Sequence, residues 1–181
     1  MGRFTTTKWQ LGLAVIVGIS SICWLYFVGT RPSPPLLPHV SPCKALASGM
    51  RRVGDRGFQF DVSTKDFSIS EGSSDVAPFV HGFDLVPKQS NAILKIEFGW
   101  RPMESITPDP ALTFLKRIER RPIFDDKGKP IGEDKWGYLD TGERWRSVRF
   151  SGIGTAKYGL VDRQAAEIFD RVINSVCSVQ N

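Results

Sequence analysis

The chain has 181 residues, with 24 lysines and arginines against 19 acidic residues, a formal charge of +5 and only two histidines. Arg3 and Lys8 are the only charged side chains before residue 31, so the remaining 22 basic and 19 acidic residues give the rest of the chain a charge of +3. Nucleic-acid-binding domains concentrate basic residues on one face, so a charge this small argues against a nucleic-acid partner.

The first predicted element is an apolar run that carries no charged residue from Trp9 to Thr30. Its central residues, Leu11 to Val28, would span about 27 Å as a helix, close to the thickness of a bilayer core. A cleaved signal peptide has a shorter apolar stretch that ends in small residues, whereas the bulky Phe27 stands near the end of this one. We therefore expect residues 11–29 to form an uncleaved transmembrane signal-anchor helix.

The basic residues around this run predict its orientation. Arg3, Lys8 and the terminal amine precede the run, and only Arg31 follows it closely. Positive residues are retained on the cytoplasmic side, so we expect a cytoplasmic N-terminus at residues 1–10 and export of everything after the anchor. The sequence has no Asn-x-Ser/Thr site, which favours a bacterial periplasm or outer surface over a glycosylating pathway.

Beyond the anchor, residues 31–42 contain five prolines in twelve positions. Such a density favours extended polyproline geometry and predicts a semi-rigid stalk at residues 30–42. Residues 43–181 then have the length of one domain. Cys43 and Cys177 stand at its two ends, and in an oxidising compartment they predict a disulfide that closes the domain. The alternative is two separate thiols, with Cys177 packed as a small apolar residue.

Alternation of apolar and polar residues predicts an antiparallel sheet in this domain. The expected strands lie near residues 58–62, 67–69, 80–86, 92–100, 135–139, 144–150 and 156–161, with turns at 126–128, 140–142 and 151–154. A short helix is expected at Cys43–Arg51, and another from Pro110 that gives way to a strand near Ile118.

The clearest helix signal comes last. Asp162 is a good N-cap for a helix whose apolar positions recur at spacings of three and one: Ala165, Ile168, Phe169, Val172, Ile173 and Val176. Glu167 and Arg171 stand four apart on its polar side. The predicted fold class is α+β: a transmembrane helix, then one antiparallel-sheet domain covered by a C-terminal amphipathic helix.

Candidate catalytic residues are few. Asp140-Thr141-Gly142 resembles the active-site triplet of aspartic proteases, which would imply an acid-type hydrolase using Asp140 in a homodimer. That family has a small residue after the glycine, where this chain has Glu143, so a hairpin turn is the favoured interpretation. His39 falls in the stalk, and no nucleophile motif accompanies His81. We therefore assign no catalytic residue and no cofactor.

Metal ligands are equally sparse. Four acidic residues bracket a turn and could collect calcium: Asp125, Asp126, Glu133 and Asp134. Lys127 and Lys129, however, occupy positions where a calcium loop needs oxygen donors, so a solvated turn is the preferred interpretation and no metal is assigned.

Basic residues supply the one candidate binding site. Two segments contribute to it: Arg120 and Arg121 in one, and Arg144, Trp145, Arg146 and Arg149 in the other. Arg144 and Arg146 point to the same face of a strand, so neighbouring strands would form a guanidinium patch beside Trp145. Such a patch suits a carboxylate, a phosphate or an anionic lipid headgroup. The alternative is a charged sheet face that pairs with nearby acids and prevents aggregation.

Together these features predict a single-pass membrane protein whose exported domain is a non-catalytic binding or accessory module of the cell envelope. The alternatives are an anion- or lipid-headgroup-binding domain and the hydrolase based on Asp140. Envelope proteins or an anionic ligand are the expected partners beside the membrane itself, and the sequence defines no oligomeric state.

Overall fold

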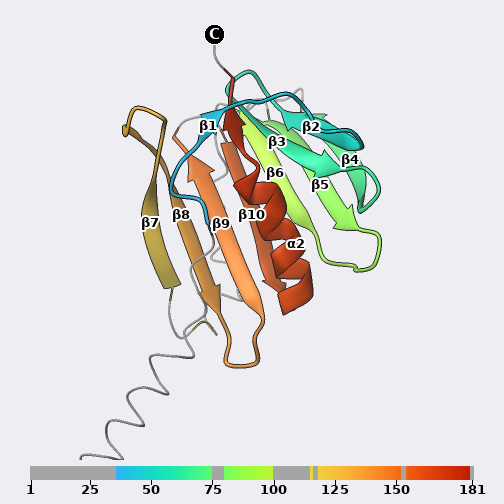
Figure 1. Ribbon diagram of the computed structural model, residues 1–181. Coiled ribbons are helices and arrows are strands. Elements are labelled where there is room, and N and C mark those ends of the chain that lie inside the picture. The colour runs from blue at the N-terminus through green and yellow to red at the C-terminus, as the bar shows by residue number, and fades with distance from the viewer. Residues whose placement is uncertain (1–35, 75–79, 100–114, 116–117, 152–153, 180–181) are drawn as a thin grey trace, which may run out of the picture. The chain divides into compact units, whose positions relative to one another are not determined.

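The computed structural model describes residues 36–74, 80–99, 115, 118–151 and 154–179, all within one compact unit that runs from Leu36 to Asn181 (Figure 1). The described residues form a mostly antiparallel β domain with one helix near its C-terminal end.

The larger sheet has seven strands, and every neighbouring pair is antiparallel. Its spatial order is β4 (Phe67–Ser74), β5 (Val80–Pro87), β6 (Leu94–Gly99), β10 (Gly154–Val161), β9 (Arg144–Phe150), β8 (Pro130–Tyr138) and β7 (Ile118–Phe124). Strands β4 to β6 and β7 to β10 are each joined in sequence order, so the sheet consists of two meanders that meet where β6 pairs with β10.

A smaller sheet has the order β1 (Ser41–Pro42), β11 (Cys177–Ser178), β3 (Phe58–Ser63) and β2 (Met50–Gly54). Strands β2 and β3 form an antiparallel hairpin. The two-residue strands β1 and β11 pair in parallel, which brings the start of the domain beside the end of the chain.

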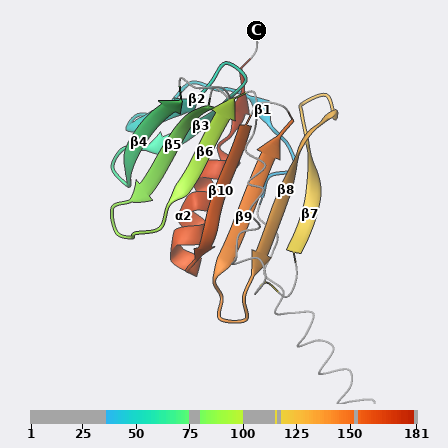
Figure 2. The same ribbon diagram turned by 180° about the vertical axis from the view of Figure 1, so that it is seen from behind.

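Helix α2 (Arg163–Asn174) lies on one face of the larger sheet, in front of β10 in Figure 1 and behind it in Figure 2. The carboxylate of Asp162 accepts a hydrogen bond from the backbone N–H of Ala165 at 2.8 Å, as the cap signal predicts. At the other end, the hydroxyl of Ser175 accepts from the N–H of Asp61 on β3 at 2.9 Å. The amphipathic C-terminal helix is thus confirmed, and it is tied to the smaller sheet.

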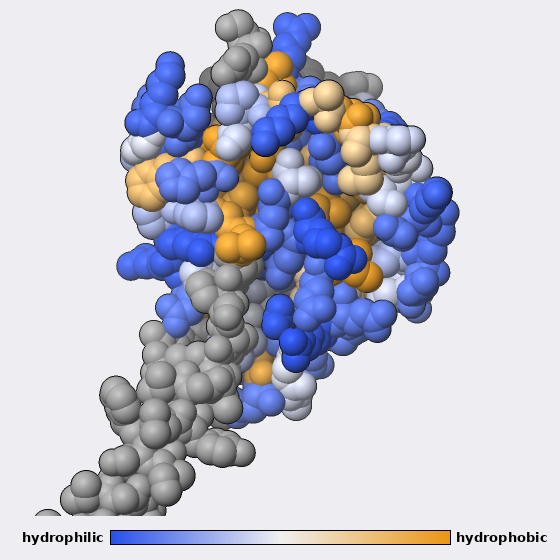
Figure 3. Space-filling model, in the orientation of Figure 1, coloured by the Kyte–Doolittle hydropathy of each residue, from blue (hydrophilic) through white to orange (hydrophobic). Residues whose placement is uncertain are grey.

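The hydrophobic core lies between the larger sheet on one side and α2 with β3 on the other. Phe58 of β3 stacks on Phe150 of β9 with ring centroids 4.5 Å apart, and Phe169 of α2 lies 5.4 Å from Tyr158 of β10. On the helix side of the molecule, hydrophilic side chains cover most of the described surface, and hydrophobic side chains show only as small patches between them (Figure 3). We refer to this helix-covered face of the larger sheet as the inner face and to the opposite one as the outer face.

The expected strands are found with shifts of a few residues, and β9 has the predicted bounds. The short helix expected at Cys43–Arg51 is wrong, because Met50–Gly54 is a strand that pairs with β3. Gly49, with φ of +79°, stands immediately before this strand, in a conformation outside the right-handed helix. The helix expected from Pro110 and the anchor expected at residues 11–29 lie outside the described residues. Within the described part of the chain, no helix is both long enough and apolar enough to cross a membrane.

Residues 36–43 form a segment that we call the N-terminal strap, which runs over the inner face beside α2 (Figure 1). Its backbone pairs with the end of β7: Val40 N–H donates to the carbonyl of Phe124 at 2.9 Å, and Phe124 N–H donates to the carbonyl of Pro38 at 2.8 Å. Leu37 and Val40 are buried in the core. The compact unit therefore begins at Leu36, and residues 36–42, which were expected to belong to a free stalk, lie on the domain instead.

The strap ends at the disulfide. Cys43 is bonded to Cys177, with the two Cα atoms 4.7 Å apart and a sequence separation of 134 residues. The N–H of Cys43 also donates to the carbonyl of Ser178 at 3.0 Å. The predicted disulfide is present, and it holds the strap against β11.

Candidate functional site: a buried arginine–aspartate cluster

The six residues of the predicted basic patch divide between the two faces of the larger sheet. Side chains alternate along a strand, and the register of β7, β8 and β9 places Arg121, Arg144 and Arg146 on the inner face. The same register places the other three on the outer face: Arg120, Trp145 and Arg149. The single patch expected from the sequence is therefore not formed, because no small ligand reaches both faces of a sheet.

On the inner face, Arg146 is fully buried and bonded to Asp134 of the neighbouring strand. Its Nε and Nη2 atoms donate to the two carboxylate oxygens of Asp134, each at 3.0 Å. Its Nη1 donates to Asp170 of α2 at 2.8 Å, and Nη2 also lies 3.3 Å from the Asn174 Oδ1. A two-point guanidinium–carboxylate contact is the strongest ion-pair geometry available to these side chains.

The electrostatics of Arg146 follow from these contacts. Burial by itself would lower the pKa of Arg146, but hydrogen bonds and attraction from Asp134 and Asp170 outweigh it, so the pKa lies above its ordinary value. The side chain is therefore a permanent cation in the interior, and the two aspartates neutralise it.

Arg121 is the second cation on Asp134. Its Nε and Nη2 atoms lie 3.3 Å and 3.1 Å from Oδ2 of Asp134, and its guanidinium carbon stands 4.8 Å from the ring centroid of Trp136. Asp134 is fully buried and is thus held by two arginines from the strands on either side of it.

Asp170 brings the helix into the same group. The hydroxyl of Tyr158 donates to its Oδ1 at 3.0 Å, and Arg144 approaches its Oδ2 at 3.9 Å. Burial and the charge of Asp170 raise the pKa of Tyr158, so this phenol stays protonated and serves as a donor. We call these six residues the arginine–aspartate cluster: Arg121, Asp134, Arg144, Arg146, Tyr158 and Asp170.

The cluster connects three parts of the fold: the larger sheet, helix α2 and the strap. It draws on β7, β8, β9 and β10 of the sheet and on α2, and Arg146 Nη2 reaches the carbonyl of Leu36 in the strap at 3.5 Å. Three arginines face two aspartates, so the cluster carries a formal charge of +1. A charge network of this kind fixes the position of the strap and the helix over the sheet, and removing one member of a buried pair costs about 3–5 kcal/mol.

On the outer face, the three residues of the predicted patch differ in exposure. Trp145 is buried, whereas Arg120 and Arg149 are exposed. Between them on β8, Lys135 and Glu133 form a salt bridge at 2.9 Å. This face therefore carries charges of both signs on its neighbouring strands, beside the buried ring of Trp145.

The structure also places the catalytic and metal candidates. Asp140 is an exposed residue of the β8–β9 hairpin turn, which Gly142 closes with a φ of +95° and an N–H bond to the Leu139 carbonyl. The predicted hairpin is thus confirmed. His81 lies 2.9 Å from Glu71 on the neighbouring strand, and His39 forms the parallel bridge to Phe124.

Of the four calcium candidates, Asp134 belongs to the cluster, and Glu133 is paired with Lys135. Asp125 accepts the N–H groups of Lys127 and Lys129 within its own turn. Among the described residues, no group of three or more metal-binding side chains comes together.

Sequence reasoning missed Asp134, Tyr158 and Asp170 as members of the cluster. Asp170 had a signal that could have been used: it stands four residues after Ala166 and three before Ile173, both of which are buried. A carboxylate beside buried apolar residues needs a cation or a hydrogen-bond donor as its partner, and Arg146 of β9 is one.

Comparisons of this chain with protein families, with characterised proteins and with solved structures find no match. Its function is therefore argued from its own residues.

Proposed function

We propose that this chain is a single-pass membrane protein whose run 11–29 is the anchor and whose α+β domain is an exported, non-catalytic binding or accessory module of the cell envelope. The observation that carries the proposal is the Cys43–Cys177 disulfide. Disulfides persist in oxidising compartments and are rare in the cytosol. The uncharged run and the basic residues before it support the same topology.

The contacts of the strap support a role in which the domain is attached through its N-terminal side. The strap connects the residues before Leu36 to the domain, and three kinds of contact fasten it: pairing with β7, burial of Leu37 and Val40, and the disulfide. In an anchored module, these contacts would join the domain to the part of the chain that leads to the anchor.

Photo-crosslinking in cells tests the binding role. A photoreactive residue is placed on the outer face at Arg120 and, as a matched control, in the β7–β8 turn at Lys127, in the full chain and in a variant that lacks residues 11–29. A binding module predicts a discrete adduct from the outer face that requires the anchor. Equal, diffuse labelling from both positions, or labelling that does not depend on the anchor, would contradict the proposal.

A second candidate function is anion binding, which the residual charge of the cluster favours. Arg121 and Arg144 are partly exposed on either side of the buried Arg146, and within the described residues the salt bridge of Arg144 is its 3.9 Å approach to Asp170. These two side chains are the part of the predicted patch that could contact an anionic headgroup. Flotation of the full chain with phosphatidylglycerol vesicles cannot isolate such contacts, because the anchor itself inserts.

The suitable probe is therefore soluble glycerol phosphate added to the full chain in detergent. Anion binding predicts saturable NMR line broadening of the probe that Arg144→Gln weakens and Lys127→Gln leaves unchanged. Equal broadening with both variants would exclude this site.

A further inference from the structure

A cleft of about 360 Å³ opens between α2 and two turns, the β3–β4 turn at Lys65–Asp66 and the β5–β6 turn at Pro87–Gln89. Its volume is within the range of small-molecule sites, about 300–1,000 Å³. The cleft lies on the far side of α2 from the cluster, and no residue of the cluster lines it.

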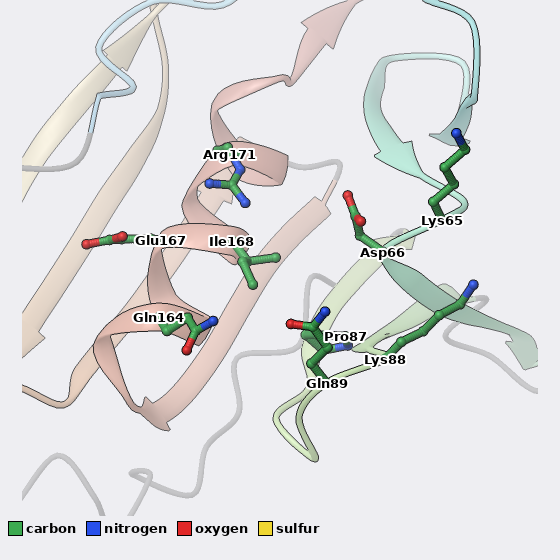
Figure 4. A pocket seen from close by; sticks show the side chains of 9 residues that line it. All are labelled: Lys65, Asp66, Pro87, Lys88, Gln89, Gln164, Glu167, Ile168 and Arg171. Atoms are coloured by element: carbon green, nitrogen blue, oxygen red, sulfur yellow. The ribbon is translucent and has the colours of Figure 1, made fainter.

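The floor of the cleft is apolar and its walls are polar. Pro87 is buried and Ile168 is half-buried. Figure 4 shows Gln164, Ile168 and Arg171 of α2 on one side of the opening, with Asp66 and Gln89 on the other. Polar groups from three separate elements therefore converge over an apolar surface.

Four of these polar side chains are available to a ligand. Asp66, Gln89, Gln164 and Arg171 make no side-chain hydrogen bond or salt bridge with any other described residue. Arg171 was expected to pair with Glu167, but Glu167 instead accepts from Nε of Arg163 at 2.9 Å and points away from the cleft.

The remaining cations are not directed at the opening. Lys88 donates to the backbone carbonyl of Thr64 at 3.3 Å, and both Lys65 and Lys88 extend away from α2 in Figure 4. The groups that face the opening in Figure 4 are thus one guanidinium, one carboxylate and two amides. With Lys65, Lys88 and Glu167 included, the lining carries a formal charge of +1.

We infer that this cleft binds a free dipeptide-sized zwitterion. Arg171 would receive the carboxylate, because a guanidinium offers it a two-point contact. Asp66 would receive the ammonium group from the opposite wall. The amides of Gln89 and Gln164 each offer a donor and an acceptor, which matches the N–H and C=O of a peptide group. Ile168 and Pro87 provide contact for small apolar side chains. A simple anion is disfavoured by Asp66, and a simple cation by Arg171.

The probe is L-alanyl-L-alanine, added to the full chain in detergent and followed by saturation-transfer NMR. A solvent-exposed site of this size predicts a dissociation constant on the order of 1 mM. Arg171→Gln and Asp66→Asn each remove one charged contact and are expected to weaken binding about tenfold. Lys127→Gln is the control, because it removes an exposed cation of the β7–β8 turn that does not line the cleft.

Two modified probes test the two charges separately. N-acetyl-alanyl-alanine lacks the ammonium group and alanyl-alaninamide lacks the carboxylate, so each should bind about tenfold more weakly than the dipeptide. Absence of saturable binding to the wild-type chain would overturn the inference, as would equal binding of all three probes or unchanged binding by both cleft variants. None of these outcomes bears on export or anchoring. If dipeptide binding is not found, the proposed function still stands and is tested separately by the crosslinking experiment.

Discussion

The replacement Arg146→Met tests the role of the arginine–aspartate cluster. Methionine fills much of the same space with a flexible apolar chain but removes the guanidinium. The variant loses both contacts to Asp134, at 3.0 Å each, and the contact to Asp170 at 2.8 Å. Asp134 is fully buried and retains only Arg121 as a cation, whereas Asp170 retains Tyr158 and the distant Arg144.

Breaking a buried pair while leaving its partner charged costs about 3–5 kcal/mol. Because each aspartate keeps at least one partner, we expect the lower end, about 3 kcal/mol of unfolding free energy. For a compact unit of this size, that corresponds to a fall of roughly 10 °C in Tm. The assay is thermal unfolding of the full chain in detergent, with the disulfide intact, followed by tryptophan fluorescence.

The control and the double variant sharpen this test. Arg163→Met removes an exposed salt bridge to Glu167 and should change the free energy by less than about 0.5 kcal/mol. Asp134→Leu with Arg146→Met removes both members of the main pair, so it should cost at least about 1 kcal/mol less than the two single changes added together. A loss below about 1 kcal/mol for Arg146→Met, or strict additivity in the double variant, would refute the structural role of the cluster.

Three further changes test other parts of the fold. Leu37→Ala should destabilise the domain by about 2–5 kcal/mol while Leu36→Ala has little effect, because Leu37 is buried and Leu36 is 77% exposed. Equal Tm values for the two variants would mean that the strap does not pack on the domain. Gly132→Ala should lower the unfolding free energy by about 1–3 kcal/mol, because its Cβ would stand 2.2 Å from the Arg149 carbonyl oxygen. Gly159→Ala is the control, because its Cβ would meet no atom within 4 Å. Denaturant unfolding compares the two variants, and similar midpoints would contradict the β8–β9 register. Tyr158 has a raised pKa in the folded chain, so its stabilising contribution is present below about pH 10 and declines above it as the unfolded state ionises. Tyr158→Phe should therefore remove this part of the loss of stability at alkaline pH, measured by unfolding at a series of pH values. An unchanged slope of stability against alkaline pH would count against the buried phenol.

Much of the domain could be predicted from local patterns. The 3.6-residue stripe and the Asp162 cap identified α2, and two-residue alternation identified strands such as β9 to the residue. The Asp140–Gly142 turn followed from turn chemistry alone. These features depend on neighbours in the chain, so a single sequence contains the information they require.

The features that were missed depend on distant contacts. Strand β2 has little alternation of apolar and polar residues, and its pairing with β3 stabilises it as a strand. The proline-rich sequence of Leu36–Pro42 is typical of a stalk, but Val40 hydrogen-bonds to Phe124 of β7 and holds this segment on the domain. The arginines were predicted to share one surface because strand order was unknown. Strand β8 lies between β7 and β9, and its Asp134 pairs with both Arg121 and Arg146, so an acidic side chain lies among the predicted basic residues.

The most direct measurement of the proposed topology is maleimide labelling of the cysteines in intact cells, before and after reduction, read by mass. A Cys23→Ser background leaves only Cys43 and Cys177. An exported, disulfide-closed domain predicts that both cysteines label only after reduction, with a reagent that does not cross the inner membrane. Free labelling of both without reduction, and only in lysed cells, would place the domain in the cytoplasm and contradict the export, the disulfide and the proposed envelope role together.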